Sequence, residues 1–225
     1  MPDTYRDPQR LARIVAIALA LFSFCDVMFT AAEINTIRSI DRYLAGIGDM
    51  SELEAADMFS GLTGLGVVIM MLFVVVVLCM WIHRVNKNAQ AFDHHGVMTV
   101  SPGWNVGYFF IPFANLLMPF RGLAETYRVS ANPAEPTAVA IPGLMRLWWG
   151  CWLVSGVLGN ISFRLSLSAE TLETFKLASQ INVTSFVFDM PALATLVWFV
   201  RKLTDHQQQE LLASDMSEPA LGPTA

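Results

Sequence analysis

Charged residues are scarce in this sequence. Of its 225 residues, 15% are charged and 54% are hydrophobic, whereas soluble domains carry about a quarter of charged residues. So apolar a composition excludes an ordinary soluble domain and is typical of a membrane protein. No basic block occurs and the net charge is -5, which argues against nucleic acid as a partner.

Cysteine and histidine are also rare. The three cysteines, Cys25, Cys79 and Cys151, lie far apart in apolar runs and match no CxxC or zinc spacing. Only His83 approaches an apolar run, so a haem held between two facing histidines would lack its second ligand. We therefore expect no metal site and no cofactor.

Catalytic motifs are missing as well. The sequence contains no HExxH, GxSxG, P-loop or GxGxxG pattern, which removes the main sequence grounds for a hydrolase or a nucleotide-dependent enzyme. We predict that the chain is not an enzyme. An intramembrane enzyme is the least favoured alternative, because neither its nucleophile nor its base can be named.

What the sequence does have is apolar runs of spanning length, about 20 residues each. They cover residues 11–32, 62–82, 144–165 and 178–200. We predict an all-α integral membrane bundle of four transmembrane helices in one domain, residues 11–203. A cytoplasmic segment, 1–10, would precede it, and a polar cytoplasmic tail, 204–225, would follow and be disordered at its end. A cleavable signal peptide in the first run is the alternative.

The region between the first two runs predicts a helix break and a new start. Apolar residues keep helical spacing beyond the first run until Gly46 and Gly48. Ser51 and Glu54 have the spacing of a capping box, so we expect them to open the second helix. After that helix, a polar connection is expected over residues 83–100.

Small residues predict where helices approach one another. Ser60 and Gly64 lie four residues apart at the start of the second run, and such a face lets another helix backbone come close. This face, and small residues in the third run, make a homo-oligomer or a membrane-protein partner plausible.

Residues 101–121, SPGWNVGYFFIPFANLLMPFR, form an apolar segment interrupted by prolines. Pro102, Pro112 and Pro119 remove backbone donors and disturb the helical ladder. Such a segment persists in hydrocarbon only where protein or trapped water satisfies the freed carbonyls. We predict a Pro-broken re-entrant or interfacial segment, and not a fifth spanning helix.

The basic residues predict the orientation. If segment 101–121 enters and leaves on one side, most lysines and arginines fall on that side, whereas a full crossing would divide them evenly. The positive-inside rule then places both termini in the cytoplasm and the chain in the inner membrane. The residues assigned to the cytoplasmic side are Arg6, Arg10, Arg13, Arg84, Lys87, Arg121, Arg128, Arg146, Arg201 and Lys202.

A short surface helix is expected directly after the broken segment. Arg121, Glu125 and Arg128 would share one of its faces. With Arg84 and Lys87 they form a cytoplasmic rim suited to anionic lipid headgroups. Topology determination alone explains the rim equally well, because positive loops need no ligand.

Polar residues inside the apolar runs are functional candidates by default. Asp189 is the stronger candidate, because Pro191 follows it and would open a backbone carbonyl to a bound cation. A structural ion pair between Asp26 and Arg164 is an alternative reading of the other acid. The intramembrane polar candidates are Asp26, Asn115, Asn160, Arg164 and Asp189.

Three stretches of the chain together resemble a known bacterial membrane family, the one catalogued as domain of unknown function 4328. They are WIHRVNKNAQAF at 81–92, SPGWNVGYFFIPFANLLMPFRGLAETYRVS at 101–130 and LMRLWWGCWLVSG at 144–156. The most specific residues are the Ser-Pro-Gly-Trp stretch, Pro112, Asn115, Pro119 and Arg121. The resemblance implies a multi-pass bacterial protein and carries no activity.

These features lead to two hypotheses of function. The first is an interaction, scaffold or lipid-associated component whose partners are the bilayer, anionic headgroups or another membrane protein. The second is a small transporter or channel, with the broken segment and Asp189 lining a polar path.

Overall fold

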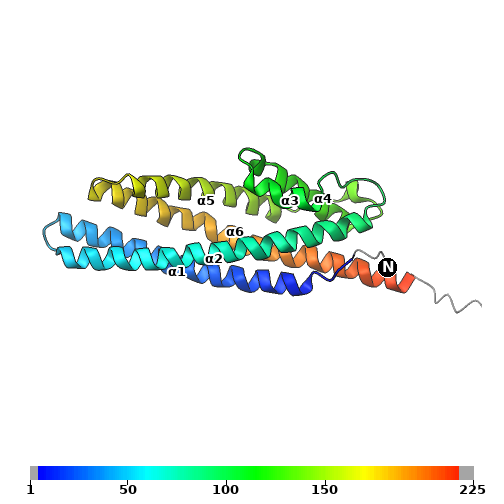
Figure 1. Cartoon of the computed structure of the whole chain (residues 1–225), viewed down its shortest axis with the longest axis horizontal. Helices are drawn as coiled ribbons and strands as arrows, with labels where there is room; N and C mark the ends of the chain where they lie inside the picture. The colour runs from blue at the N-terminus through cyan, green and yellow to red at the C-terminus, as the bar shows by residue number, and fades with distance from the viewer. Residues whose placement is uncertain (1–4, 218–225) are drawn as a thin grey trace, which may run out of the picture. The chain divides into compact units, whose positions relative to one another are not determined.

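The structure is a computed structural model that describes residues 5–217, with side chains described up to residue 213. No strand occurs in this part of the chain, so the all-α prediction is confirmed. The predicted disordered end of the tail lies outside the described residues. The elements are α1 (Gln9–Leu44), α2 (Met50–Phe92), α3 (Pro102–Gly107), η1 (Tyr108–Phe110), η2 (Ala114–Leu116), α4 (Met118–Ala131), η3 (Pro136–Ala138), α5 (Gly143–Leu167) and α6 (Leu172–Ser217) (Figure 1).

Three helices are long and apolar enough to cross a membrane: α1, α2 and the Leu172–Ala213 part of α6. These helices indicate a membrane protein. The helix α5, which covers the third predicted run and contains two arginines, is not among these three.

The chain divides into two compact units. Unit 1 consists of Met1–Ala16, Val76–Met145 and Val197–Ala225, and unit 2 consists of Ile17–Val75 and Arg146–Leu196. Each of the helices α1, α2 and α6 therefore has one part in unit 1 and another part in unit 2.

In unit 2, glycines end α1 as the sequence predicts, but a different residue opens α2. Gly46 has φ +71°, a conformation that favours glycine. Asp49 Oδ1 accepts the backbone N–H of Glu52 at 2.8 Å and the hydroxyl of Ser51 at 2.8 Å. The predicted capping box of Ser51 and Glu54 is therefore wrong, because Asp49 already occupies the N-cap position.

The helices of unit 2 are held together at small and hydroxyl residues. Thr36 Oγ1 on α1 donates to the carbonyl of Ala56 on α2 at 3.4 Å. The ring of Phe29 lies so close to Gly64 that an added Cβ would be 3.2 Å from Cε2. The predicted small-residue face thus packs α2 against α1 of the same chain, and the two helices run side by side from their turn (Figure 1).

In unit 1, α2 continues well beyond its apolar run. The predicted polar connection over 83–100 is wrong for its first half, because α2 ends only at Phe92. Val85, Ala89 and Phe92 are buried at helical spacing on this extension. Their burial stabilises this part of the helix. The polar residues between them make the segment look like a loop in the sequence.

The helix α4 is buried and not a surface helix. It ends at Ala131, two residues before Pro133. Most of its residues from Gly122 to Ser130 are nevertheless buried. The expectation of a surface helix failed because its neighbours in unit 1 cover both its polar and its apolar faces.

Candidate functional site

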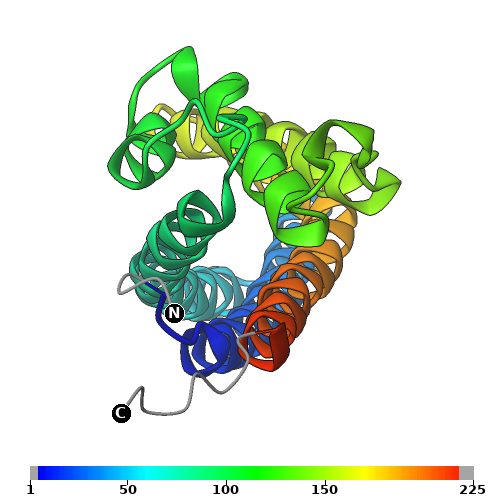
Figure 2. The same cartoon turned by 90° about the vertical axis from the view of Figure 1, so that its right-hand side faces the viewer.

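The broken segment 101–121 consists of short helical pieces: α3, η1, a turn and η2, which lead into α4 (Figure 2). This confirms that it is no continuous helix. Pro102 lies in the first turn of α3 and Pro119 in the first turn of α4, positions where a missing N–H removes no hydrogen bond. Two of its three prolines thus start helices, and Pro112 lies in the turn between η1 and η2.

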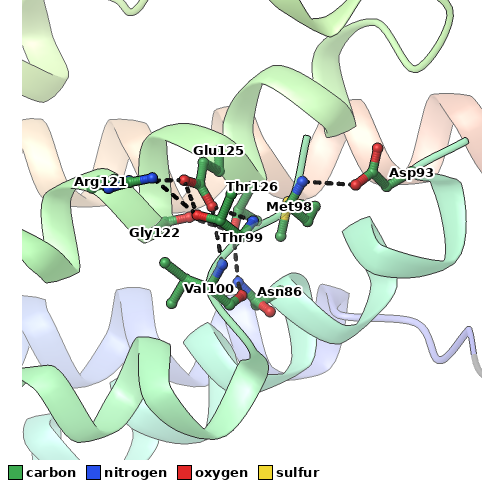
Figure 3. Close-up of polar contacts among 9 residues, drawn as sticks. All are labelled: Asn86, Asp93, Met98, Thr99, Val100, Arg121, Gly122, Glu125 and Thr126. Atoms are coloured by element: carbon green, nitrogen blue, oxygen red, sulfur yellow. Dashed lines mark hydrogen bonds and ion pairs between the residues drawn. The ribbon is translucent and has the colours of Figure 1, made fainter. Parts of the chain in front are cut away.

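Glu125 on α4 joins the two ends of the broken segment (Figure 3). Its Oε2 accepts the backbone N–H groups of Thr99 at 2.9 Å and Val100 at 3.2 Å. Its Oε1 accepts the Thr99 hydroxyl at 2.6 Å and Nε of Arg121 at 3.1 Å. One buried carboxylate thus holds the residues before position 101 against the residue at position 121.

A second set of bonds fixes α4 on α2 next to this carboxylate. Asn86 Nδ2 donates to the hydroxyl of Thr126 at 3.1 Å and to the carbonyl of Val100 at 3.3 Å. Thr126 in turn donates to the carbonyl of Gly122 at 2.8 Å. The chain entering the broken segment is therefore tied to both α2 and α4 (Figure 3).

The middle of the broken segment carries an exposed apolar tip. We use this name for Phe110, Ile111, Phe113, Leu116 and Leu117, all of which are exposed. Phe113 is 86% exposed and Leu117 is 73% exposed. Phe113 also has φ +64°, a strained conformation for a residue other than glycine. Exposed apolar patches occur where proteins contact membranes or other proteins.

The predicted basic rim lies entirely in unit 1. Arg84 is half-buried and Lys87 is exposed on α2, and neither forms a side-chain hydrogen bond or ion pair with the described residues. Arg121 is paired with Glu125 on α4, and its side chain is more than half exposed. Arg128 is half-buried, and its Nε has no hydrogen-bond partner among residues 5–213. The guanidinium and ammonium groups of Arg84 and Lys87 are thus available to an anion.

The buried asparagine of the broken segment is Asn105 and not Asn115. Asn115 lies in η2, is only half-buried, and its side chain bonds to no described residue. Asn105 in α3 is fully buried, and neither of its amide atoms has a hydrogen-bond partner in the described part of the chain. The predicted role of Asn115 therefore has no support in its contacts.

In unit 2, α1 places two carboxylates on one buried face. Asp26 and Glu33 are 8% and 5% exposed, and Thr30 lies buried between them. Glu33 accepts the hydroxyl of Ser60 on α2 and Nδ2 of Asn182 on α6, the latter at 3.4 Å. A buried carboxylate with hydrogen-bond donors from two other helices is well accommodated.

Asp189 is the third carboxylate of unit 2. Its two oxygens accept the hydroxyl of Ser155 on α5 and that of Ser185 on α6, the latter at 2.8 Å. Asp26 is close enough to Asp189 to interact with it electrostatically. The structure therefore brings together Asp26 and Asp189, two of the predicted intramembrane candidates.

The proposed pair of Asp26 with Arg164 is wrong. Arg164 is exposed on α5 and donates from Nε to Oδ1 of Asn160 at 2.9 Å. Residues 160 and 164 lie one helical turn apart, so this contact is local. Asn160 and Arg164 thus belong to an exposed face of α5 and not to the polar interior of unit 2.

No group of three or more histidine, cysteine or acidic side chains suited to a metal ion occurs among the described residues. Asp26 and Asp189 lie near each other, and two serine hydroxyls donate to Asp189.

A sequence profile described as "Domain of unknown function (DUF4328)" matches residues 47–205. The chain belongs to this family. No curated protein and no solved structure matches the chain. The DUF4328 region contains the broken segment, Glu125 and Asp189, whereas Asp26 and Glu33 precede it.

Sequence reasoning missed several residues of these sites. Glu33 was overlooked because it lies directly after the first apolar run, although Asp26, Thr30 and Glu33 share one face at intervals of four and three residues. Asn86 was assigned to a loop. Asn105 gave no signal beyond its position directly after the Ser-Pro-Gly-Trp stretch of the DUF4328 region.

Proposed function

We propose that this DUF4328 protein is a lipid-associated component of the bacterial inner membrane. In this proposal four helices span the bilayer, both termini are cytoplasmic, and segment 101–121 is an interfacial or re-entrant element on the cytoplasmic side. The observation that carries it is Glu125, whose carboxylate binds both ends of that segment. A segment whose ends meet at one residue begins and finishes at the same depth.

The apolar tip supports insertion of this element into lipid. Its large side chains are exposed within unit 1, and moving one such side chain from water into an apolar phase is favourable by about 1.5–3 kcal/mol. Trp104, which is exposed and stacks on Tyr108 with ring centroids 5.3 Å apart, is typical of the membrane interface. The tip and this aromatic pair together fit the acyl boundary and the headgroup layer.

The charges next to the tip support a preference for anionic headgroups. Arg121 follows Leu117 by one helical turn and presents its side chain to the surroundings. Arg84 and Lys87 form no ion pair within the described chain. Basic side chains at a membrane surface contribute about 1 kcal/mol each toward anionic lipid.

Depth-dependent quenching tests the insertion of the tip. A fluorophore is attached to a cysteine at position 113, in full-length protein whose native cysteines are replaced, and the protein is reconstituted into vesicles with brominated acyl chains. We expect strong quenching at position 113 and little at position 134, which lies in an exposed polar turn. Equal quenching at both positions would contradict the proposal.

Two further measurements test the topology and the lipid preference. Cysteines at positions 101 and 121 should react with impermeant reagents from the same side of the membrane. Native mass spectrometry should show retained anionic lipid, with less lipid retained after Arg84→Gln and Lys87→Gln. Labelling of positions 101 and 121 from opposite sides would exclude the proposed topology.

A small transporter is the second candidate, and the polar interior of unit 2 favours it. Asp26 and Glu33 are buried on α1, and their polar surroundings include Ser60 on α2, Ser155 on α5 and Asp189 on α6. Ionisable groups within spanning helices mark ion or proton paths. No contact of segment 101–121 supports its part in such a path. An unchanged ion flux into liposomes with Asp189→Asn would exclude this candidate.

A further inference from the structure

Asp26 differs from the other buried carboxylate on its helix. Glu33 lies on the same face of α1 and receives donors from Ser60 and Asn182. Asp26 is only 8% exposed and its Oδ2 is buried, yet this oxygen has no hydrogen-bond partner within residues 5–213. A buried polar atom without a partner costs about 1–3 kcal/mol, and more when it is charged.

The neighbour of Asp26 increases this cost. Asp189 lies within electrostatic reach, and both of its oxygens are bonded to serine hydroxyls. These two bonds use both oxygens of Asp189 as acceptors and hold its carboxylate in place. Two ionised carboxylates at close range in an apolar surrounding repel each other strongly. The pair therefore requires one compensating positive charge.

No basic side chain of unit 2 supplies that charge. Neither Asp26 nor Asp189 forms an ion pair in the described part of the chain. The other charged side chains on the helices of unit 2 are bonded elsewhere or exposed. They are Glu33 on α1 (bonded to Ser60 and Asn182), Arg42 on α1 (paired with Glu52 on α2), Arg164 on α5 (bonded to Asn160), Lys176 on α6 (paired with Asp41 on α1), and the exposed Arg38 on α1, Glu54 and Asp57 on α2, Arg146 on α5 and Glu173 on α6.

We propose that Asp26 and Asp189 form a binding site for one monovalent cation, either a proton or an alkali-metal ion. The Oδ2 atom of Asp26 provides the open acceptor, and the serine hydroxyls hold Asp189 in position. A bound proton would sit on Asp26 and supply a donor toward Asp189. An alkali-metal ion would be held by oxygens of both carboxylates and the two serines, the hard ligands that such ions prefer. The site is independent of the lipid-binding role proposed for unit 1.

The test uses the full chain in lipid nanodiscs and separates the two occupants. Infrared spectra recorded over a pH series, without alkali-metal ions, report a protonated carboxyl group. Thermal unfolding in sodium, potassium and lithium chloride, compared with N-methylglucamine chloride at equal ionic strength, reports an alkali-metal ion. The variants are Asp26→Asn and Asp189→Asn, with Asp57→Asn as an exposed control in unit 2.

A proton in the site predicts a protonated-carboxyl band near neutral pH that Asp26→Asn and Asp189→Asn remove and Asp57→Asn retains. An alkali-metal ion predicts a cation-specific rise in Tm that the same two variants abolish. Either substitution removes the repulsion between the two carboxylates, so we expect both variants to fold. If one variant does not fold, the other still tests the proposal. Absence of both signals in the wild type, or their persistence in both variants, would overturn the proposal.

Discussion

Asn105 packs directly on the backbone of Gly122. A Cβ atom at residue 122 would lie 2.3 Å from Oδ1 of Asn105 and 2.9 Å from its Cγ, and 3.2 Å from a methyl group of Val100. Both residues are fully or almost fully buried, so neither partner can move into solvent. This contact packs α3 tightly against α4 within unit 1.

Gly122→Ala should therefore destabilise unit 1. The added methyl group displaces a short, buried amide that has little freedom to rotate away, and overpacking of this kind costs about 1–3 kcal/mol. Thermal unfolding in detergent measures the effect. Gly103→Ala in α3 is the control, because nothing lies within 4 Å of its Cβ position. The double variant Asn105→Ala, Gly122→Ala should recover part of the loss; no recovery would show that the clash lies elsewhere.

The clamp at Glu125 predicts a second effect. Glu125→Gln replaces one carboxylate oxygen by an NH2 group, which accepts no hydrogen bond. Depending on which oxygen is replaced, the variant loses either the bonds from the N–H groups of Thr99 and Val100 or those from Thr99 Oγ1 and Arg121. Hydrogen bonds to a charged group contribute about 1.5–3 kcal/mol each. We expect a loss of stability of that size and faster proteolysis between residues 97 and 104. The exposed Glu135→Gln is the matched control, and equal cleavage of both variants would contradict the role of Glu125.

The broken segment and the clamp show what the sequence could and could not predict. Prolines at 102, 112 and 119 act locally on the backbone, so the interruption of the helix could be read from the chain. The partners of Glu125 lie 25 and 26 residues away, at Val100 and Thr99. Spacing on one helix placed Glu125 and Arg121 on the same face. It could not predict that the same carboxylate also binds the backbone N–H groups of Thr99 and Val100.

The sequence predicts the neighbours of a polar residue only where those neighbours lie on the same helix. Asp26 and Asp189 come from α1 and α6, and no pattern in a single sequence indicates that they meet. Asn88 and Gln207 looked like solvent-facing residues because they follow the apolar runs, yet both are fully buried. Their burial arises from the packing of α2 against α6 within unit 1, which hydropathy does not record.

The connection after α2 should respond to acid. Asp93 lies at its start, and although burial alone would raise its pKa, the N–H groups of Met98, Val97, His95 and Gly96 bind its carboxylate and lower the pKa overall. A lowered pKa in the folded state contributes stability above the ordinary value of about 3.9, and this contribution is lost as the pH falls through the folded-state pKa. The loop 93–98 should thus loosen below a pH of about 4.

Thermal stability measured against pH tests this response. The difference in Tm between the wild type and Asp93→Asn should be largest at neutral pH and should shrink on acidification, because the protonated wild type resembles the amide. Glu135→Gln, in another exposed turn, should show no such convergence. A constant difference between the wild type and Asp93→Asn at all pH values would contradict the role of these backbone bonds.

The N-cap of α2 gives a direct comparison between sequence and structure. Asp49→Ala removes the acceptor of the Glu52 N–H, whereas Glu54→Ala removes the residue that the sequence assigns to a capping box. Asp49→Ala should lower the Tm measurably, and Glu54→Ala should leave it almost unchanged. A larger loss of Tm in Glu54→Ala than in Asp49→Ala would instead support a capping box formed by Ser51 and Glu54.

Gln207 holds three parts of unit 1 together. Its Nε2 donates to the carbonyl of Val85 at 2.7 Å and to the hydroxyl of Ser130 at 3.0 Å, and its Oε1 accepts Nδ2 of Asn88 at 3.0 Å. The same Nδ2 donates to the carbonyl of Arg6 at 2.9 Å. The amide of Gln207 therefore links α6 with α2 and α4, and through Asn88 with the segment before α1.

Gln207→Leu should destabilise unit 1 strongly, because the leucine leaves a buried carbonyl, a hydroxyl and an amide without their partner. Each such group costs about 1–3 kcal/mol, and we expect about 3 kcal/mol in total after local relaxation. Gln209→Leu makes the same chemical change at an exposed position two residues away and should change the stability by less than about 0.5 kcal/mol. Chemical unfolding of both variants in the same detergent measures the difference. Equal stabilities would show that the buried amide contributes nothing to holding α2, α4 and α6 together.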